Sequence, residues 1–120
     1  MARIVALVND LFFAVKISAA AKQAGVTLEY VKGRGLMAAA KEMPGLIVFD
    51  LNDAVSEPLQ LIAQLKADPQ TAHVPVIGYL SHVQTGLKQK AIEAGCDTVM
   101  ARSAFDRDLP EIVKRYAAPA

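Results

Sequence analysis

The chain has 120 residues, of which 13 are Lys or Arg and 12 are Asp or Glu, so its formal net charge is +1. This length fits one domain, and a charge so close to zero argues against binding of nucleic acid or a membrane surface through bulk charge. A single Cys excludes a disulfide framework and a cysteine-based zinc site. Although 53% of the residues are hydrophobic, no apolar run approaches the length of a membrane span, and we expect a cytoplasmic protein.

The first half of the chain alternates between short apolar runs and segments with helical character. An Ala-rich segment free of Gly and Pro stops at Gly25, which is a typical helix end. The run Leu46 to Phe49 is apolar at every position, as in a strand buried on both faces of a parallel sheet. The predicted elements here are a strand over 4–8, a helix over 11–24, a strand over 27–31, a loop over 32–35, a helix over 36–42, a strand over 46–49 and a loop over 52–57.

The second half continues the same alternation. Pro58 suits the first turn of a helix, and apolar residues follow it at helical spacing. The predicted elements are a helix over 58–67, a strand over 74–80, a helix over 86–94, a strand over 98–101 and a helix over 109–116. Five strand–helix units in strict alternation predict a doubly wound α/β domain, with a five-stranded parallel sheet and helices on both faces.

Polar residues follow each predicted strand, where open parallel sheets place their ligand sites. Asp10 and Asp50 would repel each other at one edge, and a hard divalent cation such as Mg²⁺ is the natural bridge between them. The alternative is that Asp10 only caps the first helix and Asp50 only ends a strand. The residues at this edge are Asn9, Asp10, Lys32 to Gly35, Asp50, Asn52, Ser81, His82, Arg102 and Ser103.

Three stretches together resemble the receiver domain of bacterial two-component signalling, the CheY-like response-regulator family. They are Pro44 to Asn52, Leu65 to Pro69 with Val74 to Ile77 after it, and Ala91 to Asp97. The resemblance spans essentially the whole chain, so that residues 1–120 would form a single receiver-like domain with no output domain. It implies the flavodoxin-like, CheY-like fold with strand order 2-1-3-4-5.

The resemblance also implies roles for residues at the sheet edge. Asp50 matches the phosphoacceptor that attacks a phosphohistidine or a small phosphodonor. Asp10 matches the carboxylate that ligates Mg²⁺ together with Asp50, and Asn52 matches the residue whose backbone carbonyl completes the protein ligands. Asn9 matches the first member of the acidic pair and would act only indirectly on the metal. Arg102 falls where the family has a Lys that contacts the phosphoryl group.

Several positions depart from the family pattern. Asn9 removes one negative charge, which should weaken metal binding. Leu80 stands where the family has Thr or Ser, and Ser81 is one residue further along; because side chains alternate along a strand, Ser81 serves only if the strand bulges or ends early. Val99 replaces a common aromatic switch residue. Arg102 with Ser103 replaces Lys-Pro, and a planar guanidinium is not equivalent to an ammonium group.

Two functions remain open. One is an atypical stand-alone receiver in a phosphorelay, which accepts a phosphoryl group on Asp50 with Mg²⁺ and signals by docking to another protein. The alternative is a phosphorylation-independent pseudo-receiver that acts as an interaction module. In neither case is the chain an enzyme beyond weak self-phosphorylation or dephosphorylation. The expected partners are a histidine kinase or phosphotransfer protein and a target protein, with no nucleic acid or membrane; a homodimer is compatible with the sequence.

The sequence also bears on a competing cofactor-binding function and on candidate interaction surfaces. A flavin-type cofactor binder needs a phosphate loop rich in Ser, Thr or Gly after the first strand, whereas Asn9 to Phe13 is acidic and bulky there. In the receiver family the partner face is usually the fourth helix, fifth strand and fifth helix, here 85–94, 98–101 and 109–116. Either one of Phe12 and Phe13 is core and the other partly covered, or they form an apolar patch for a partner helix or for self-association. His73 and His82 are expected in loops and Cys96 as a buried thiol.

Overall fold

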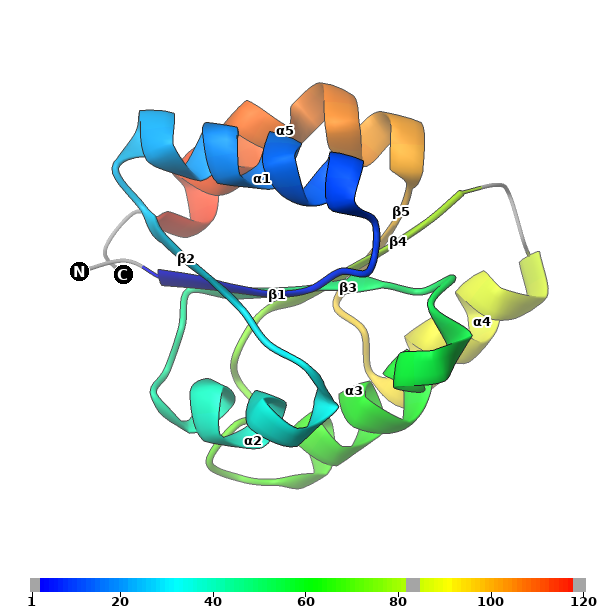
Figure 1. Ribbon diagram of the computed structural model, residues 1–120. Coiled ribbons are helices and arrows are strands. Elements are labelled where there is room, and N and C mark those ends of the chain that lie inside the picture. The colour runs from blue at the N-terminus through cyan, green and yellow to red at the C-terminus, as the bar shows by residue number, and fades with distance from the viewer. Residues whose placement is uncertain (1–2, 82–84, 118–120) are drawn as a thin grey trace.

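Five parallel strands form one sheet in the order β2-β1-β3-β4-β5, which confirms the predicted fold (Figure 1). The structure is a computed structural model that describes residues 3–81 and 85–117. Every neighbouring pair of strands is parallel. A helix after each of the first four strands therefore brings the chain back to the amino edge of the sheet, where the next strand begins. The strands are β1 (Arg3–Leu7), β2 (Thr27–Tyr30), β3 (Leu46–Asp50), β4 (Val76–Leu80) and β5 (Thr98–Ala101).

Helices cover both faces of the sheet (Figure 1). On one face lie α1 (Leu11–Ala24) and α5 (Arg102–Ala117); on the other lie α2 (Gly33–Lys41), α3 (Pro58–Ala67) and α4 (Thr85–Ala94). A short 3₁₀ helix, η1 (Ala54–Ser56), joins β3 to α3. Because both faces are covered, the central strand β3 has no solvent side, which explains its uninterrupted apolar run. No helix within the described ranges is long and apolar enough to cross a bilayer.

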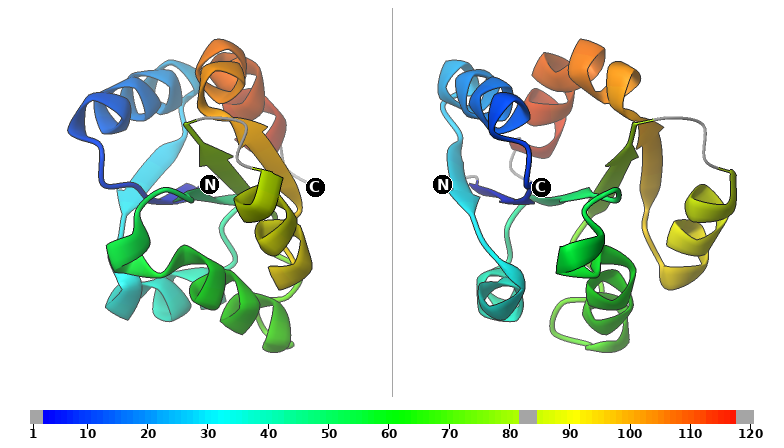
Figure 2. Two further views of the ribbon diagram at one scale, coloured as in Figure 1. Left: turned by 90° about the vertical axis from the view of Figure 1, so that its right-hand side faces the viewer. Right: turned by 45° about the vertical axis from the view of Figure 1, so that its right-hand side comes forward.

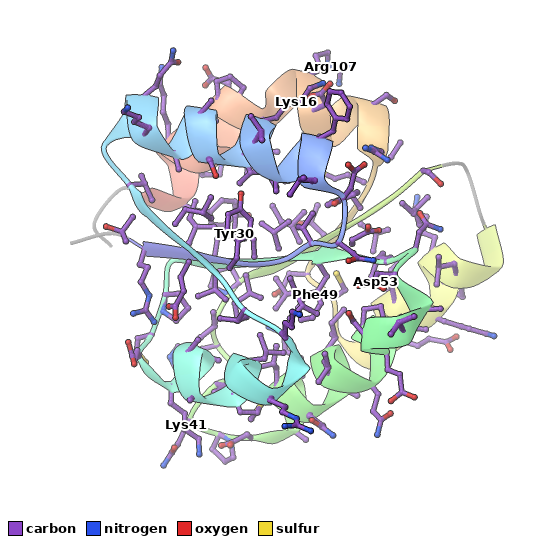
Figure 3. All side chains as sticks on the ribbon, in the orientation of Figure 1. Lys16, Tyr30, Lys41, Phe49, Asp53 and Arg107 are labelled. Carbon is purple, nitrogen blue, oxygen red and sulfur yellow. The ribbon has the colours of Figure 1, made fainter. Side chains whose placement is uncertain are left out.

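The side chains of β3 alternate between two apolar cores. Val48 packs in the core under α1 and α5, while Phe49 packs in the core over α2 and α3 (Figure 3). In the α1/α5 core three rings meet: the centroid of Phe13 is 4.8 Å from that of Tyr79 and 5.6 Å from that of Phe105. Asp50, one residue after Phe49, is therefore directed by the pleat to the α1/α5 side of the sheet.

Several predicted boundaries were wrong. Helix α2 begins at Gly33, within the predicted loop over 32–35, and its first turn is closed by the bond from Gly35 N to Lys32 O (2.9 Å). Helix α5 begins at Arg102, directly after β5, instead of at residue 109. The reason is packing: Phe105, Leu109 and Val113 recur every four residues and are all buried in the α1/α5 core, so the helix extends back to cover it.

The other strand and helix boundaries moved by one or two residues; β1 spans Arg3–Leu7 instead of 4–8, and β3 extends to Asp50. The predicted strand over 74–80 begins at Val76, and the one over 27–31 ends at Tyr30. The helix predicted over 86–94 begins at Thr85. Part of the predicted loop over 52–57 forms η1. None of these shifts alters the order of the elements.

The partly buried amine of Lys66 links three segments at the opposite edge of the sheet from Asp50. Lys66 Nζ donates to Ala72 O (3.0 Å), Val74 O (2.9 Å) and Asp97 Oδ2 (2.8 Å). The same carboxylate oxygen accepts from Val76 N at 2.8 Å, so it also fixes the start of β4. The Lys66 side chain is only 17% exposed, which makes these bonds costly to lose.

We expect Lys66→Met to lower the free energy of unfolding by about 2 kcal/mol, because buried carbonyls and a carboxylate lose a charged donor. Urea denaturation measures the change. The matched control is Lys41→Met, since Lys41 is exposed at the end of α2 (Figure 3) and should change stability by less than about 0.5 kcal/mol. Equal effects of the two substitutions would contradict the structural role of Lys66.

Candidate functional site

The carboxyl ends of the five strands lie at one edge of the sheet, which faces the viewer in the left view of Figure 2. At this edge β1 is followed by Asn9 and Asp10, and β3 ends at Asp50. Ser81 follows β4, and Arg102 follows β5 as the first residue of α5. The structure thus brings these sequence-predicted residues to the same edge.

Asp10 is both a helix cap and half of an ion pair. Its Oδ1 accepts from the backbone N–H of Phe13 at 3.3 Å, which caps α1, and its Oδ2 pairs with Arg102 Nη2. Partial burial disfavours the charged form, but the hydrogen bond from Arg102, the Phe13 N–H and the guanidinium charge outweigh it. The pKa of Asp10 is therefore below its ordinary value.

Asp50 is a partly buried carboxylate with weaker compensation. Its Oδ1 accepts from the backbone N–H of Asn52 at 2.9 Å. Burial is the largest effect and raises the pKa of Asp50, and the negative charges of Asp53 and Asp10 raise it further. The hydrogen bond from Asn52 and the positive charge of Arg102 lower it, but the net shift is upwards. Figure 3 shows Asp53 at this same edge. The two carboxyl groups therefore differ: Asp10 is held as a paired anion, while Asp50 keeps a proton more readily than a free Asp.

Asn52 links the loop after β3 to the end of β4. Its Oδ1 accepts from the backbone N–H of Ser81 at 2.6 Å, and its own N–H bonds to Asp50. Its backbone carbonyl accepts from Ala54 N at 3.0 Å. A carbonyl oxygen has two lone pairs, so this bond is compatible with a second partner. One residue thus connects the Asp50 carboxylate to the segment that leaves β4.

The positions of the family's switch pair hold aliphatic side chains. Strand β4 pairs regularly with β5 as far as Leu80, without a bulge. Leu80 is buried in the α2–α4 core, and Val99 packs against that same core. Ser81 lies just beyond the strand, is exposed and lines the hollow described below. Strand β4 ends at Leu80, as predicted, and Ser81 is the first residue beyond it, whereas Leu80 packs on the face of the sheet opposite Asp50.

Sequence reasoning missed Tyr79. It stands opposite Asp50 in the register of β3 and β4, and pleat alternation places both on the α1/α5 face. Its hydroxyl is buried and has no hydrogen-bond partner among the described residues. Burial, and then the charge of Asp50, raise the pKa of Tyr79. The sequence could have indicated Tyr79 only through the register of the two predicted strands, which places it opposite Asp50.

An open hollow of about 480 Å³ lies between α1 and α5 at this edge. Lys16 pairs with Asp106 across it at 2.9 Å, and Arg102 with Asp10. The residues that line it are Asp10, Phe12, Phe13, Lys16, Ser81, Arg102, Ser103 and Asp106.

Beside the hollow, α1 exposes apolar side chains. Phe13 is core, at 2% exposure, but Phe12 is 81% exposed, more than partial cover would leave. Leu11 at 83% and Val15 at 64% join it. We call Leu11, Phe12 and Val15 the α1 patch; of the two interpretations of the Phe pair, this exposure favours a patch.

The remaining candidates within the described residues do not line the hollow between α1 and α5. Asn9 is exposed and borders a second hollow with Lys32 and Arg34. His73 is exposed, with Nε2 3.1 Å from Met43 Sδ, and His82 lies outside the described residues. Cys96 is buried, as predicted; its thiol donates to Thr98 O at 3.2 Å, and burial raises its pKa.

The oxygen atoms at this edge are of the kind that a hard divalent cation prefers, but few protein ligands are present. Carboxylate and carbonyl oxygens are the ligands that Mg²⁺ prefers, with water completing the shell. Within residues 3–81 and 85–117 no group of three or more His, Cys, Asp or Glu side chains could hold a metal ion. The set comprises Asp10, Asp50 and the Asn52 carbonyl, and one Asp10 oxygen already bonds Arg102.

Comparison with solved structures confirms the resemblance at the level of the fold. The chain superposes on a response regulator from Hahella chejuensis with a TM-score of 0.84 at 15% identity, covering 97% of this chain and 95% of that one. It matches the receiver domain of a histidine kinase from Syntrophus aciditrophicus with a TM-score of 0.81 at 22% identity, covering 98% and 90%. No protein-family model matches the sequence, and no curated protein matches it.

A third neighbour carries a metal. The receiver domain of a sensor histidine kinase from Pseudomonas aeruginosa PAO1 has magnesium coordinated in its active-site cleft. Its TM-score is 0.80 at 18% identity, covering 97% of each chain. The fold of this chain is therefore the fold of response-regulator receiver domains.

The opposite pKa shifts predict opposite effects of two matched substitutions. Asp50→Asn should raise the free energy of unfolding at neutral pH, because the raised folded-state pKa means that ionisation above about pH 4 costs stability. Asp10→Asn should lower it, because the depressed pKa of Asp10 contributes stability that is lost as pH falls.

Urea denaturation between about pH 3 and pH 7 tests both signs. The difference between each variant and the wild type should shrink towards the acid end, as the carboxyl groups take up protons, and Asp10 should do so at lower pH than Asp50. The same sign for both variants at neutral pH would contradict the electrostatic difference between Asp10 and Asp50.

Proposed function

We propose that the protein is an atypical response-regulator receiver, which accepts a phosphoryl group on Asp50 and signals by docking to other proteins. The observation that carries the proposal is the partly buried Asp50 at the end of β3, with the charges of Asp10 and Arg102 acting on it. The position of Asp50 at the carboxyl edge of the sheet supports the proposal, because open parallel sheets bind their ligands at that edge.

The proposed chemistry is one displacement at phosphorus. A carboxylate oxygen of Asp50 forms a bond to the phosphorus of a phosphohistidine or of a small donor such as acetyl phosphate. The bond from phosphorus to the imidazole nitrogen or acetate oxygen breaks, and that leaving group keeps the electron pair. The product is an acyl phosphate on Asp50, a signalling modification and not an enzymatic turnover.

A divalent ion would be held by Asp10, Asp50 and the carbonyl of Asn52, with Asn9 contributing only indirectly. Such an ion, when bound, supplies charge neutralisation for the carboxylate and the phosphoryl oxygens. With Asn9 in place of an acid, binding should be weak. Ser81 offers a hydroxyl at the edge of the hollow, while Leu80 offers none.

Arg102 would contact the phosphoryl group in place of the family's Lys. Its charge already acts on Asp50, and a guanidinium can give two parallel hydrogen bonds to phosphoryl oxygens. A negative group on Asp50 would draw Arg102 away from Asp10. The link from Asp50 through Asn52 to Ser81 offers a path for this change to reach the end of β4, where the usual hydroxyl–aromatic pair is replaced by Leu80 and Val99.

A second candidate is a pseudo-receiver that docks without phosphorylation. The observation in its favour is the Arg102–Asp10 ion pair, which engages the carboxylate oxygen that a metal would use. Without metal, a phosphoryl group on Asp50 would have fewer charges to balance it.

Either function requires docking surfaces. The α1 patch lies next to the hollow and is a candidate for a helix of a histidine kinase or phosphotransfer protein. The face formed by α4, β5 and α5, suggested by the family, is the candidate surface for a target protein or a second copy.

Acetyl phosphate with excess Mg²⁺ should add one phosphate to the wild-type protein and none to Asp50→Asn, because only the carboxylate can form the acyl phosphate. Intact-mass spectrometry measures the adduct. Asp53→Asn is the matched control, since Asp53 lies at the same edge in the following loop and should leave the adduct unchanged. No adduct on the wild type at high Mg²⁺, or an adduct that survives in Asp50→Asn, would contradict the phosphoacceptor proposal and favour the pseudo-receiver.

A further inference from the structure

Arg102 is fixed by two contacts at the sheet edge. Its Nη2 pairs with Asp10 Oδ2, and its guanidinium carbon lies 4.9 Å from the centre of the Phe13 ring. A guanidinium over an aromatic face gains a cation–π interaction. Phe13 itself is locked in the three-ring core with Tyr79 and Phe105, so it is a rigid support.

Both oxygens of Asp10 are engaged. Oδ1 accepts from the backbone N–H of Phe13, and Oδ2 accepts from Arg102. A cation shared by Asp10 and Asp50 needs an Asp10 oxygen at about 2.0–2.1 Å if the cation is Mg²⁺. Using Oδ1 would weaken the cap of α1, and Oδ2 is the oxygen that Arg102 occupies. Each carboxylate oxygen has a second lone pair, so the conflict is electrostatic: a guanidinium on Oδ2 places a positive charge beside a divalent ion on the same carboxylate.

The negative charges near Asp50 favour the binding of a divalent cation. Asp10, Asp50 and Asp53 contribute three negative charges, while Lys16, the other cation of the hollow, is paired with Asp106. Arg102 pairs with Asp10, and Lys32 and Arg34 border the second hollow together with Asp53, while no ion pair within the described residues engages Asp50. The Arg102 side chain is 40% exposed, so it can turn towards water without opening the core.

We infer that Arg102 is a built-in competitor of divalent cations, so that metal can bind between Asp10 and Asp50 only when Arg102 releases Asp10. This inference rests on the proposed function, because it concerns the ion that the phosphoacceptor site would use. It gives Arg102 two successive positions: on Asp10 when no ion is bound, and free to meet an anionic group on Asp50 when one is.

The test is titration with Mn²⁺ alone, followed by the electron paramagnetic resonance signal of the free ion. Arg102→Gln should bind Mn²⁺ about tenfold more tightly than the wild type, because a competing unit charge beside a divalent ion is removed. The matched control is Arg107→Gln in the same helix. Arg107 pairs with Asp108, has a side chain that is 74% exposed, and lies on the outer side of the α1/α5 layer (Figure 3), so its loss should not change the affinity.

Adding Asp10→Asn to Arg102→Gln should abolish the gain. An affinity of Arg102→Gln equal to or below that of the wild type would overturn the inference, as would an equal gain in Arg107→Gln.

A second measurement avoids any variant that fails to fold. In the wild type, saturating Mg²⁺ should shift the Arg102 Nε–H signal in nitrogen-15 NMR spectra and leave that of Arg107 in place; an unmoved Arg102 signal at saturation would overturn the inference. The phosphoacceptor proposal fails separately: an Asp50 that takes no phosphate in a protein with the expected Mn²⁺ affinities would reject that proposal and leave the competition intact.

Discussion

The charge of two carboxylates at one edge of a parallel sheet is the constraint on which the site depends. Because β1 and β3 are parallel neighbours, the residues that follow them, including Asp10 and Asp50, are carried to the same side of the molecule. Their mutual repulsion has to be balanced. In this protein the balance comes from Arg102, which α5 delivers directly after β5.

The ion pair makes the two carboxyl groups unlike. Asp10, paired with Arg102 and capping α1, has a lowered pKa and serves as a fixed anion of the structure. Asp50, partly buried and near the charges of Asp53 and Asp10, has a raised pKa, so its charged form is disfavoured. A nearby bound cation stabilises the charged form of such a carboxylate. This difference between the two carboxyl groups is the basis of the proposed phosphoacceptor role of Asp50 and of the proposed competition between Arg102 and a metal ion.

The order of elements and the edge residues could be predicted from the sequence, because alternating apolar runs and helical segments fix a parallel sheet, and such a sheet fixes where its loops gather. The hydrogen-bond and ion-pair partners of these edge residues could not be predicted from the sequence. Nothing local shows that Arg102 reaches Asp10, 92 positions away, or that α5 extends back to Arg102 to bury Phe105. The role of Asn52 was predicted from its backbone carbonyl, whereas its side chain turns out to bond Ser81 N. Tyr79 reads as an ordinary strand residue until its register with Asp50 is known.

We propose that the Arg102 guanidinium occupies the position on Asp10 that a divalent cation would otherwise take. A crystal structure of the wild-type protein grown with Mn²⁺, with the ion located by its anomalous scattering, tests this claim most directly. The account predicts a manganese peak in contact with both Asp10 and Asp50, and an Arg102 side chain that no longer touches Asp10. Manganese bound between the two carboxylates with the Arg102–Asp10 pair intact would contradict it.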